Sequence, residues 1–403
     1  MVGNNSFVPY GHQSIDKADV NAVVDVLNSE WLTQGPVVAE FEKAVARRTG
    51  AKHAVAVSSG TAALHCACFA AGVGRGDEII TAPITFAASG NCARYLGADV
   101  RLVDVHPESH CLDPDRLEAA ITGRTRAIIP VDFTGRPCDM DAINAIATQH
   151  RIIVIEDAAH SFGATYKGRA VGGLADMTIF SFHPVKLITT GEGGMILTND
   201  DDLAMNLRMY RSHGTTKGEF TPLQEIEEGA DNWGGQPCDQ RQESKVQWYY
   251  EMQLLGFNYR ITDFQCALGI NQLGKMDHFL ERRREIAVRY NAAFSSNPLI
   301  ETPAVNGDWE SAWHLYVINL DLANMQRTRR QVFEDLRRLN IGVHVHYIPL
   351  HLHPYYRQTY GYQRGDFPVA EAFYDTALTL PLFPDLSDTD FQRVVDGVLT
   401  NVR

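Results

Sequence analysis

The chain has 403 residues, of which 45% are hydrophobic, so it can bury more apolar surface than one hydrophobic core usually holds. Its 36 Lys and Arg residues against 49 Asp and Glu residues give a net charge of −13, which argues against a surface for nucleic acid or anionic membranes. Two domains are therefore expected, and any anionic substrate must be bound by local donors.

Helix and strand patterns alternate through the first two thirds of the chain, as is typical of a mostly parallel sheet flanked by helices. A helix is predicted to begin at Ser14–Lys17, because four apolar residues then share one face: Val20, Val23, Val24 and Leu27. Short apolar runs predict buried strands at 54–57, 78–81, 127–131, 152–155 and 177–181. Ligands collect beyond the carboxyl ends of strands in such sheets, so the residues after these runs are candidates for chemistry.

The later part of the chain predicts a second, smaller unit. Residues 217–245 are acidic and polar without a clear period, which predicts a long loop. A long helix from about Asp263 to Phe294 is expected to link the α/β layer to a C-terminal α+β domain, to which the run 313–318 supplies a strand. We expect the large domain, with an N-terminal segment, to span 1–262 and the linking helix and small domain to span 263–403.

The cysteines and apolar runs bear on the compartment. The seven cysteines are odd in number, include no C-x-x-C pair and mostly lie in apolar stretches, which favours buried thiols over disulfides or a metal site. The first residues lack the basic and apolar regions of a signal peptide, and no apolar run approaches the ~20 residues of a membrane span. We therefore expect a cytoplasmic protein with no membrane partner, no nucleic-acid partner and no bound metal.

Two of the strand ends carry polar groups that have an ordinary and a functional explanation. The strand before Ser59 runs through Gly60 and Thr61 into an apolar helix, an arrangement that can cradle a phosphate, although Gly and Thr more often serve simply as helix caps. Asp157 follows an apolar strand, where it either caps a turn or keeps a pyridine nitrogen protonated. His160 either packs beside such a ring or is a core histidine.

The third strand end is the most informative. Lys186 is a lone lysine among apolar residues, followed by a glycine-rich turn, and burial of an unpaired ammonium is costly. Burial lowers the pKa of such an amine and makes it a nucleophile suited to imine formation. Ser181, at the end of the same strand, can add a phosphate donor beside Gly60 and Thr61. Together the three strand ends predict a site that binds a phosphate, a pyridine ring and a carbonyl group.

Several strings resemble the DegT/DnrJ/EryC1/StrS sugar aminotransferase family over nearly the whole chain. They are SSGTAAL (58–64), GDEIITAPITF (76–86), EDAAHSFGA (156–164), SFHPVKLITTGEGG (181–194) and GFNYRITDFQCALG (256–269). The resemblance implies a fold-type I transferase dependent on pyridoxal 5′-phosphate (PLP), with a mostly parallel mixed sheet flanked by helices and a smaller C-terminal α+β domain.

The resemblance also implies roles for individual residues. Lys186 would form the covalent imine link with PLP, and Asp157 would pair with its pyridine nitrogen. The other implied cofactor contacts are Gly60, Thr61 and Ser181 at the phosphate, Phe86 stacked on the ring, His160 near the 3-oxygen, and Asn258 reaching across a homodimer interface to the partner's phosphate. The implied lining of a sugar-nucleotide cleft is Tyr10, Trp31, Leu32, Thr33, His346 and Tyr347. For Phe86, Tyr10 and Trp31, ordinary aromatic packing is an open alternative.

Within the family, four further strings are similar to the branch that aminates C4 in pseudaminic acid synthesis: WLTQGP (31–36), SFHPVK (181–186), SAWHLYV (311–317) and VHYIPLHLHPYY (345–356). The implied reaction transfers the amino group of L-glutamate to a UDP-linked 4-keto-6-deoxy sugar, giving UDP-4-amino-4,6-dideoxy-N-acetyl-β-L-altrosamine. The alternatives are amination at C3 or of a dTDP-sugar, a sugar dehydratase, and a non-catalytic binding protein. The related dehydratases carry histidine in place of the lysine, whereas Lys186 is present here.

Overall fold

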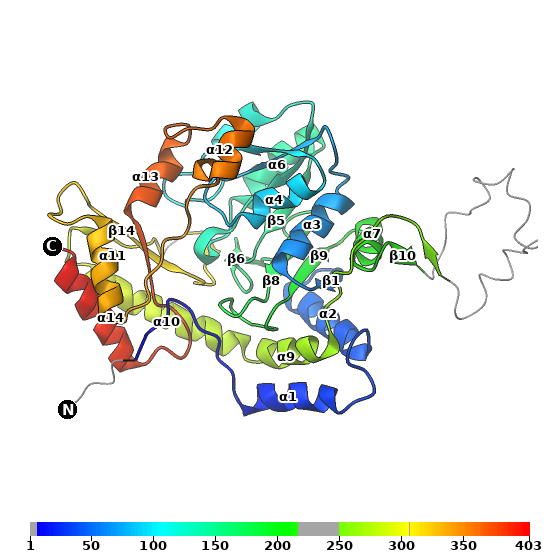
Figure 1. Cartoon of the computed structure of the whole chain (residues 1–403), viewed down its shortest axis with the longest axis horizontal. Coiled ribbons are helices and arrows are strands. Elements are labelled where there is room, and N and C mark those ends of the chain that lie inside the picture. The colour runs from blue at the N-terminus through cyan, green and yellow to red at the C-terminus, as the bar shows by residue number, and fades with distance from the viewer. Residues whose placement is uncertain (1–5, 217–249, 306) are drawn as a thin grey trace, which may run out of the picture.

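A computed structural model describes residues 6–216, 250–305 and 307–403. Within these residues the largest sheet has seven strands in the order β1-β9-β8-β5-β4-β2-β3 (Figure 1). All neighbouring strands are parallel except β9, which is antiparallel to both β1 and β8. The strands are β1 His53–Val57, β2 Glu78–Thr81, β3 Asp99–Leu102, β4 Thr125–Ile129, β5 Ile153–Asp157, β8 Met177–Ser181 and β9 Gly194–Thr198. The expected mostly parallel mixed sheet flanked by helices is confirmed.

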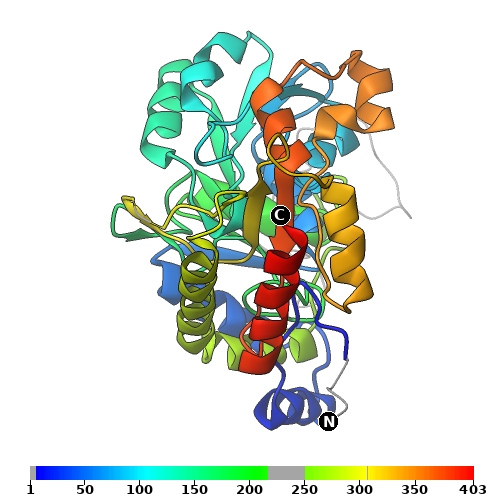
Figure 2. The same ribbon diagram turned by 90° about the vertical axis from the view of Figure 1, so that its left-hand side faces the viewer.

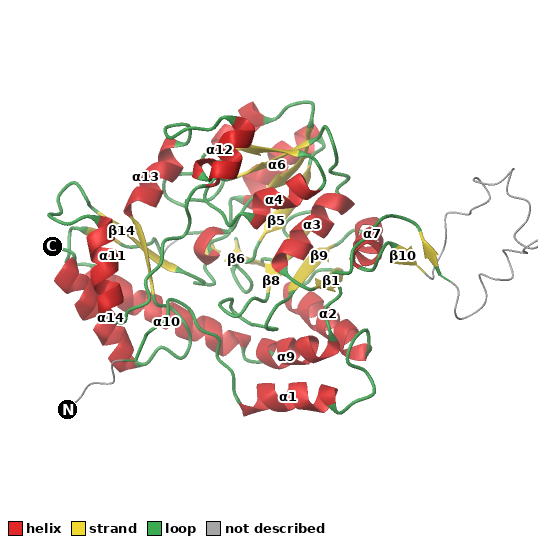
Figure 3. Cartoon of the chain, in the orientation of Figure 1, coloured by secondary structure: helices red, strands yellow, loops and turns green. Residues whose placement is uncertain are grey.

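Helices enclose this sheet, and smaller sheets lie beside it (Figure 3). The helices are α1 Lys17–Leu27, α2 Pro36–Thr49, α3 Gly60–Ala70, α4 Ala88–Tyr95, α5 Pro114–Leu117, α6 Met140–His150, α7 Asp201–Arg211, α9 Asp263–Leu273, α10 Met276–Phe294, α11 Arg329–Arg338, α12 Pro354–Tyr360, α13 Pro368–Thr376 and α14 Asp388–Asn401. The short strands are β6 Thr165–Tyr166, β7 Arg169–Ala170, β10 Thr215–Thr216, β11 Glu251–Met252, β12 Ile300–Glu301, β13 Trp309–Glu310, β14 Tyr316–Leu320 and β15 Ala377–Leu380.

The strand predictions hold for the centre of the sheet and miss two of its strands. Each of the five predicted runs forms a strand, with ends shifted by up to two residues. The edge strand β3 is short and half exposed, so its apolar signal is weak. Strand β9 directly follows the glycine-rich turn, where turn residues obscure its beginning.

The expected single helix from Asp263 to Phe294 is wrong, because the structure has two helices, α9 and α10. They are separated by Gly274 and Lys275, and glycine is a poor helix former. Lys275 turns its ammonium towards α1, where it forms ion pairs with Asp16 and the buried Asp19. The interruption therefore fixes α1 against the junction of α9 and α10, below the sheet in Figure 1.

Helix α1 begins where predicted, and Asp16 accepts hydrogen bonds from the N–H groups of Ala18 and Asp19. Most of its predicted apolar face is exposed, and on this face only Val23 is half-buried. Val20, Val24 and Leu27 are 51%, 44% and 53% exposed. An exposed apolar helix face of this kind is typical of a surface that another protein covers.

The C-terminal part has a hydrophobic core of its own, formed by α10, α11, α14 and the sheet β12-β14-β15. Figure 2 shows α11 and α14 side by side on this part of the molecule. Val8, from the N-terminal segment, joins the same core. The boundary between residues 262 and 263 stays a prediction, and the predicted loop at 217–245 lies outside the described residues. Among the described helices, none is long and apolar enough to cross a membrane.

The predicted strand at 313–318 is partly wrong. Strand β14 begins only at Tyr316 and pairs with β12 and β15. Trp313 has φ +49°, which takes the backbone out of the extended region. The residues before β14 instead contact the segment that follows β4 of the large sheet. There the N–H groups of Ala312 and Leu315 donate hydrogen bonds to the carbonyls of Gly135 and Thr134.

Candidate active site

A cavity of about 540 Å³ opens at the carboxyl ends of the parallel strands. Asp157 is the last residue of β5 and Ser181 the last residue of β8, while Gly60 follows β1. Two segments that are distant in the sequence, around Tyr10 and around His346, complete the wall of the cavity. The predicted site residues that the structure brings together here are Tyr10, Gly60, Thr61, Phe86, Asp157, His160, Ser181, Lys186, His346 and Tyr347.

One wall of the cavity has the features of a phosphate site. Helix α3 begins at Gly60, and Ser59 caps it by accepting a hydrogen bond from the N–H of Ala62. The N–H groups of Gly60 and Thr61 lie in the first turn, where no carbonyl of the same helix can accept them. A Cβ atom at Gly60 would lie 3.1 Å from the hydroxyl oxygen of Ser181. The glycine therefore lets that hydroxyl approach the positive end of the helix, and a phosphate fits this donor set.

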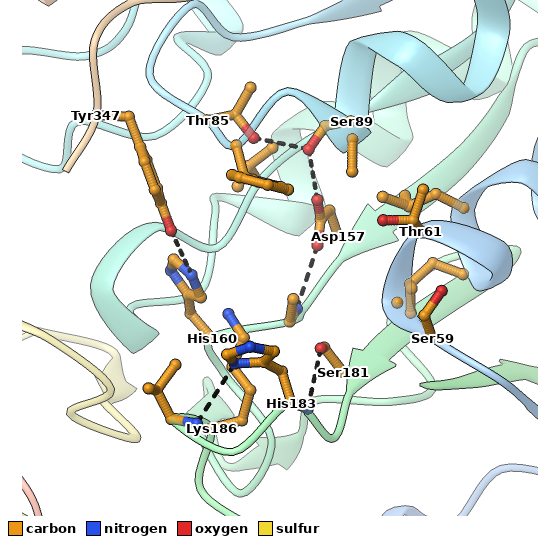
Figure 4. A pocket seen from close by; sticks show the side chains of 18 of the residues that line it. Ser59, Thr61, Thr85, Ser89, Asp157, His160, Ser181, His183, Lys186 and Tyr347 are labelled. Atoms are coloured by element: carbon orange, nitrogen blue, oxygen red, sulfur yellow. Dashed lines mark hydrogen bonds between the residues drawn. The ribbon is translucent and has the colours of Figure 1, made fainter. Parts of the chain in front are cut away.

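Asp157 lies on the floor of the cavity and is 6% exposed (Figure 4). Its Oδ2 accepts a hydrogen bond from the Ser89 hydroxyl at 2.6 Å, and its Oδ1 accepts one from the N–H of Ala159 at 3.2 Å. Burial raises the pKa of Asp157, whereas these bonds and the charge of Lys186 lower it. A protonated pyridine nitrogen beside this carboxylate would compensate its burial.

Lys186 stands in the turn after β8, where its backbone N–H donates to the carbonyl of His183 at 2.9 Å. Burial lowers the pKa of its ammonium to about 8, and the charge of Asp157 opposes this shift. The fraction of neutral amine near physiological pH is therefore much larger than for an exposed lysine. Such an amine can act as a nucleophile towards an aldehyde and as a base towards a carbon acid.

His160 and Tyr347 form a pair above the lysine. The Tyr347 hydroxyl lies 3.1 Å from His160 Nε2 (Figure 4). His160 is 7% exposed, and burial lowers its pKa, so the imidazole is neutral near pH 7. Phe86 is 61% exposed, and its ring centroid lies 6.2 Å from that of Tyr347.

Tyr10 and His346 are far apart in the sequence and meet in the wall of the cavity. Their ring centroids are 5.1 Å apart, and His346 Nδ1 lies 2.9 Å from the Thr379 hydroxyl. Burial lowers the pKa of His346 to about 3, so this ring is a neutral hydrogen-bonding group rather than a cation.

Four predicted site residues do not line the cavity of the single chain. Trp31, Leu32 and Thr33 are exposed and lie between α1 and α2, where the Leu32 carbonyl accepts a bond from the N–H of Asp263. Asn258 is exposed and bridges to Ser212. The predicted role of Asn258 concerns a partner subunit. The assignments of all four residues stay predictions.

The structure adds residues that the sequence did not indicate. Ser89, in the first turns of α4, binds Asp157 and is itself bonded to Thr85 at 2.7 Å. A serine in a short helix carries no distinguishing sequence signal. Glu192 and His344 also line the cavity. His314 lies 3.5 Å from the lysine amine, and its signal was a histidine inside an apolar run.

Known proteins share this architecture. Residues 13–399 match the DegT/DnrJ/EryC1/StrS aminotransferase family. The spore coat polysaccharide biosynthesis protein SpsC of Bacillus subtilis is 43% identical over 395 residues, which are 98% of this chain and 97% of that protein. Helicobacter pylori PseC, an aminotransferase involved in pseudoaminic acid biosynthesis, is 30% identical with a TM-score of 0.87, over 98% of this chain and 99% of that one. Spr1654 of Streptococcus pneumoniae in its PLP form is 29% identical with a TM-score of 0.86, over 98% of both chains.

Proposed function

This chain belongs to the DegT/DnrJ/EryC1/StrS aminotransferase family, and we propose that it transfers the amino group of L-glutamate to C4 of a UDP-linked 4-keto-6-deoxy-N-acetylhexosamine. The product would be UDP-4-amino-4,6-dideoxy-N-acetyl-β-L-altrosamine. At the coarser level the chain is a sugar aminotransferase of fold type I that depends on PLP. A non-catalytic binding protein is therefore no longer a competing explanation.

The observation that carries the chemistry is the pairing of Lys186 and Asp157 in one cavity with a phosphate site. When bound, PLP supplies an aldehyde and an electron-accepting pyridine ring. We assign its phosphate to Gly60, Thr61 and Ser181, which fit it as described above. Asp157 would keep the pyridine nitrogen protonated, because a cation beside a buried carboxylate is stabilised.

Lys186 would serve in both halves of the reaction. Its Nζ is placed to bond with the cofactor aldehyde and, when free, would remove the proton from the α-carbon of glutamate. In the second half the same amine would return a proton to C4 of the sugar. His160 and Phe86 line the same cavity, and they would contact the cofactor's 3-oxygen and its ring, respectively. Because 2-oxoglutarate would leave before the keto sugar reacts, with the amino group held in the site between the two halves, we expect ping-pong kinetics.

The choice of a nucleotide sugar rests on the part of the cavity wall around Tyr10 and on the relatives. Tyr10, His346 and Tyr347 offer rings and neutral polar groups to a sugar. The likeness to PseC favours a role in pseudaminic acid synthesis, and the choice of C4 rests on the resemblance of the sequence strings given above. SpsC, a spore coat polysaccharide biosynthesis protein, is more similar in sequence, and its name favours amination of a sugar for a polysaccharide as the second candidate.

We also propose a homodimer whose two sites are shared. The exposed apolar residues of α1 and the exposed Phe257, Leu255 and Tyr95 are surfaces that a second copy would cover. Asn258 lies next to Phe257, so an interface here would bring it near the partner's site. The six cysteines among the described residues are free thiols, all of them buried, which supports the proposed cytoplasmic location.

The test is product analysis with a panel of UDP- and dTDP-linked keto sugars, glutamate and PLP. Mass spectrometry and NMR should find the amino group at C4 of the UDP-linked sugar. A product aminated at C3, or turnover only with a dTDP-sugar, would replace the proposed substrate and leave the sugar aminotransferase assignment in place.

A further inference from the structure

We propose that His314 is a positioning residue that accepts a hydrogen bond from the Lys186 amine and holds it at the reacting carbon. The inference rests on the proposed role of Lys186. His314 comes from the loop before β14, far from the lysine in sequence, and its Nε2 lies 3.5 Å from Lys186 Nζ. The histidine is 5% exposed, so this contact is shielded from water.

The backbone around His314 is built to bring the ring to this place. Trp313 takes φ +49°, an unfavourable conformation for a large side chain. On one side of this loop lies Gly135, with φ +107°. A Cβ atom at Gly135 would lie 2.8 Å from the N atom of Trp313, 3.0 Å from that of His314 and 3.1 Å from the carbonyl oxygen of His160. Only glycine therefore lets these backbones meet.

On the other side the loop is held by a buried arginine. Arg283 is 1% exposed, and its Nη1 donates to the carbonyls of Trp313, His314 and Leu382 at 3.2, 3.3 and 3.0 Å. Burial lowers its pKa to about 10, and among the described residues it has no carboxylate partner. Burying a guanidinium in this way is costly. Two of the three carbonyls that this guanidinium binds belong to the loop that presents His314 to the lysine.

The chemistry of the two groups decides the direction of the bond. A lysine ammonium has three donors and no acceptor, so Nε2 of His314 must be unprotonated when it faces the charged amine. Burial lowers the pKa of His314, as does the neighbouring charge of Lys186, so the ring is neutral. The other titratable groups that interact electrostatically with Lys186 are Asp157, His160, His183 and His346. Of these, Asp157 alone carries a negative charge.

The consequence concerns the released amine. A lysine side chain has about four rotatable bonds, so a free amine would sample many positions in a cavity of this size. A fixed acceptor restricts the amine to one side of the cavity. Misplacing a catalytic group by about 1 Å can slow a reaction about 100-fold.

The test compares His314→Leu, which removes the acceptor, with His314→Gln, whose amide oxygen restores one. In the apoprotein, the pH dependence of labelling of Lys186 by an amine-reactive reagent is followed by mass spectrometry of its peptide. The labelling midpoint should fall by about one pH unit in the Leu variant, because the ammonium loses its acceptor, and should stay near the wild-type value in the Gln variant. His110→Leu, which removes a histidine outside the cavity, is the matched control and should leave the midpoint unchanged.

In the PLP-loaded protein, the half-reaction with glutamate should slow 10- to 100-fold in the Leu variant with unchanged glutamate affinity, and the Gln variant should recover part of the rate. An unchanged midpoint and rate in the Leu variant, or a midpoint that rises, would overturn the proposal. If the Leu variant does not fold, ¹⁵N NMR of the histidine rings decides. Lys186→Ala should shift the Nε2 signal of His314, and an unmoved signal would overturn it.

These outcomes are separate from those that test the proposed function. If Lys186→Ala kept its turnover, the role of the lysine itself would be wrong. If Lys186 is essential and His314→Leu behaves as wild type, the inference about His314 alone fails.

Discussion

At the residue scale, the site depends on two ionisable groups whose pKa values are brought closer together by burial. The pKa of Asp157 is raised and that of Lys186 is lowered, each by loss of water, and each charge partly offsets the shift of the other. Such opposed shifts are typical of catalytic groups. Because burial of these charged groups costs free energy, they also reduce the stability of the apoprotein.

A first prediction concerns this cost. The pKa of Lys186 is about 8 in the folded chain, against a value of 10.5 for an ordinary lysine. Between these pH values the unfolded chain binds more protons, so the contribution of Lys186 to stability rises with pH from about 8 to 10.5 and is most unfavourable below that range. Lys186→Met in the apoprotein should therefore unfold at higher urea concentration than wild type at pH 7. The gain is on the order of 1–3 kcal/mol.

The gain should shrink as the pH rises towards 10.5, because the folded-state lysine is then mostly neutral, and it should vanish above that pH, where the lysine is neutral in both states. Urea titrations at pH 7 and at pH 10 measure this directly. Equal stability of the two proteins at pH 7 would show that the ammonium is well solvated and that its pKa is ordinary.

His346 provides a second prediction at this scale. Its ring lines the cavity beside Tyr10 and is held by Thr379. His346→Ala should raise the KM for the nucleotide sugar about 10- to 100-fold, because a polar group that orients the sugar is lost. The glutamate half-reaction, followed by absorbance of the cofactor, should be nearly unchanged. Equal losses in both halves would place His346 at the cofactor instead.

At the element scale, the sequence predicted the parts of the fold that local patterns determine. Apolar runs identified the central strands, and the residues that follow them identified Asp157 and Lys186. The break between α9 and α10 was missed, because one glycine, Gly274, inside a helical pattern does not by itself show that a helix ends there. The loop that carries His314 was missed for a different reason. Its course is set by Gly135 and Arg283, which are remote in sequence.

The start of α3 gives a prediction at this scale. A Cβ atom at Gly60 would lie 3.0 Å from the Cβ of Ser181 and would occupy the space in front of the helix. Gly60→Ala should therefore weaken PLP binding about tenfold or more and leave the fold intact, since alanine suits a helix. Fluorescence titration of the apoprotein with PLP measures the change.

Gly74→Ala is the matched control, because nothing lies within 4 Å of a Cβ atom at that glycine. Its PLP affinity should equal that of the wild type. If Gly60→Ala also bound PLP normally, the phosphate would have to lie elsewhere in the cavity.

At the scale of the whole molecule, the single chain leaves apolar surface uncovered near residues with proposed roles. Val20, Val24 and Leu27 on α1 and Phe257 beside Asn258 are all exposed. The sequence indicated Asn258 only through its resemblance to a family, because no pattern within one chain reveals a contact across two. The same holds for Trp31, Leu32 and Thr33, which do not line the cavity of their own chain.

Shared sites make a prediction for mixed dimers. Neither Lys186→Ala nor Asn258→Ala should be active alone, but heterodimers of the two should recover some activity, because one of the two sites then has both residues. Subunit exchange between differently tagged chains, with heterodimers isolated before the assay, measures this. Isolated heterodimers without activity would mean that each chain completes its own site.

The central claim is that this protein moves an amino group from glutamate to C4 of a UDP-linked keto sugar through Lys186. The direct measurement supplies L-[¹⁵N]glutamate, PLP and the UDP-linked 4-keto-6-deoxy-N-acetylhexosamine, and records the ¹⁵N–¹³C couplings of the product by NMR. We predict ¹⁵N bonded to C4 of the sugar, with an equal amount of 2-oxoglutarate formed, and neither product with Lys186→Ala. A sugar without ¹⁵N, or the label in the sugar formed equally well by Lys186→Ala, would contradict the account.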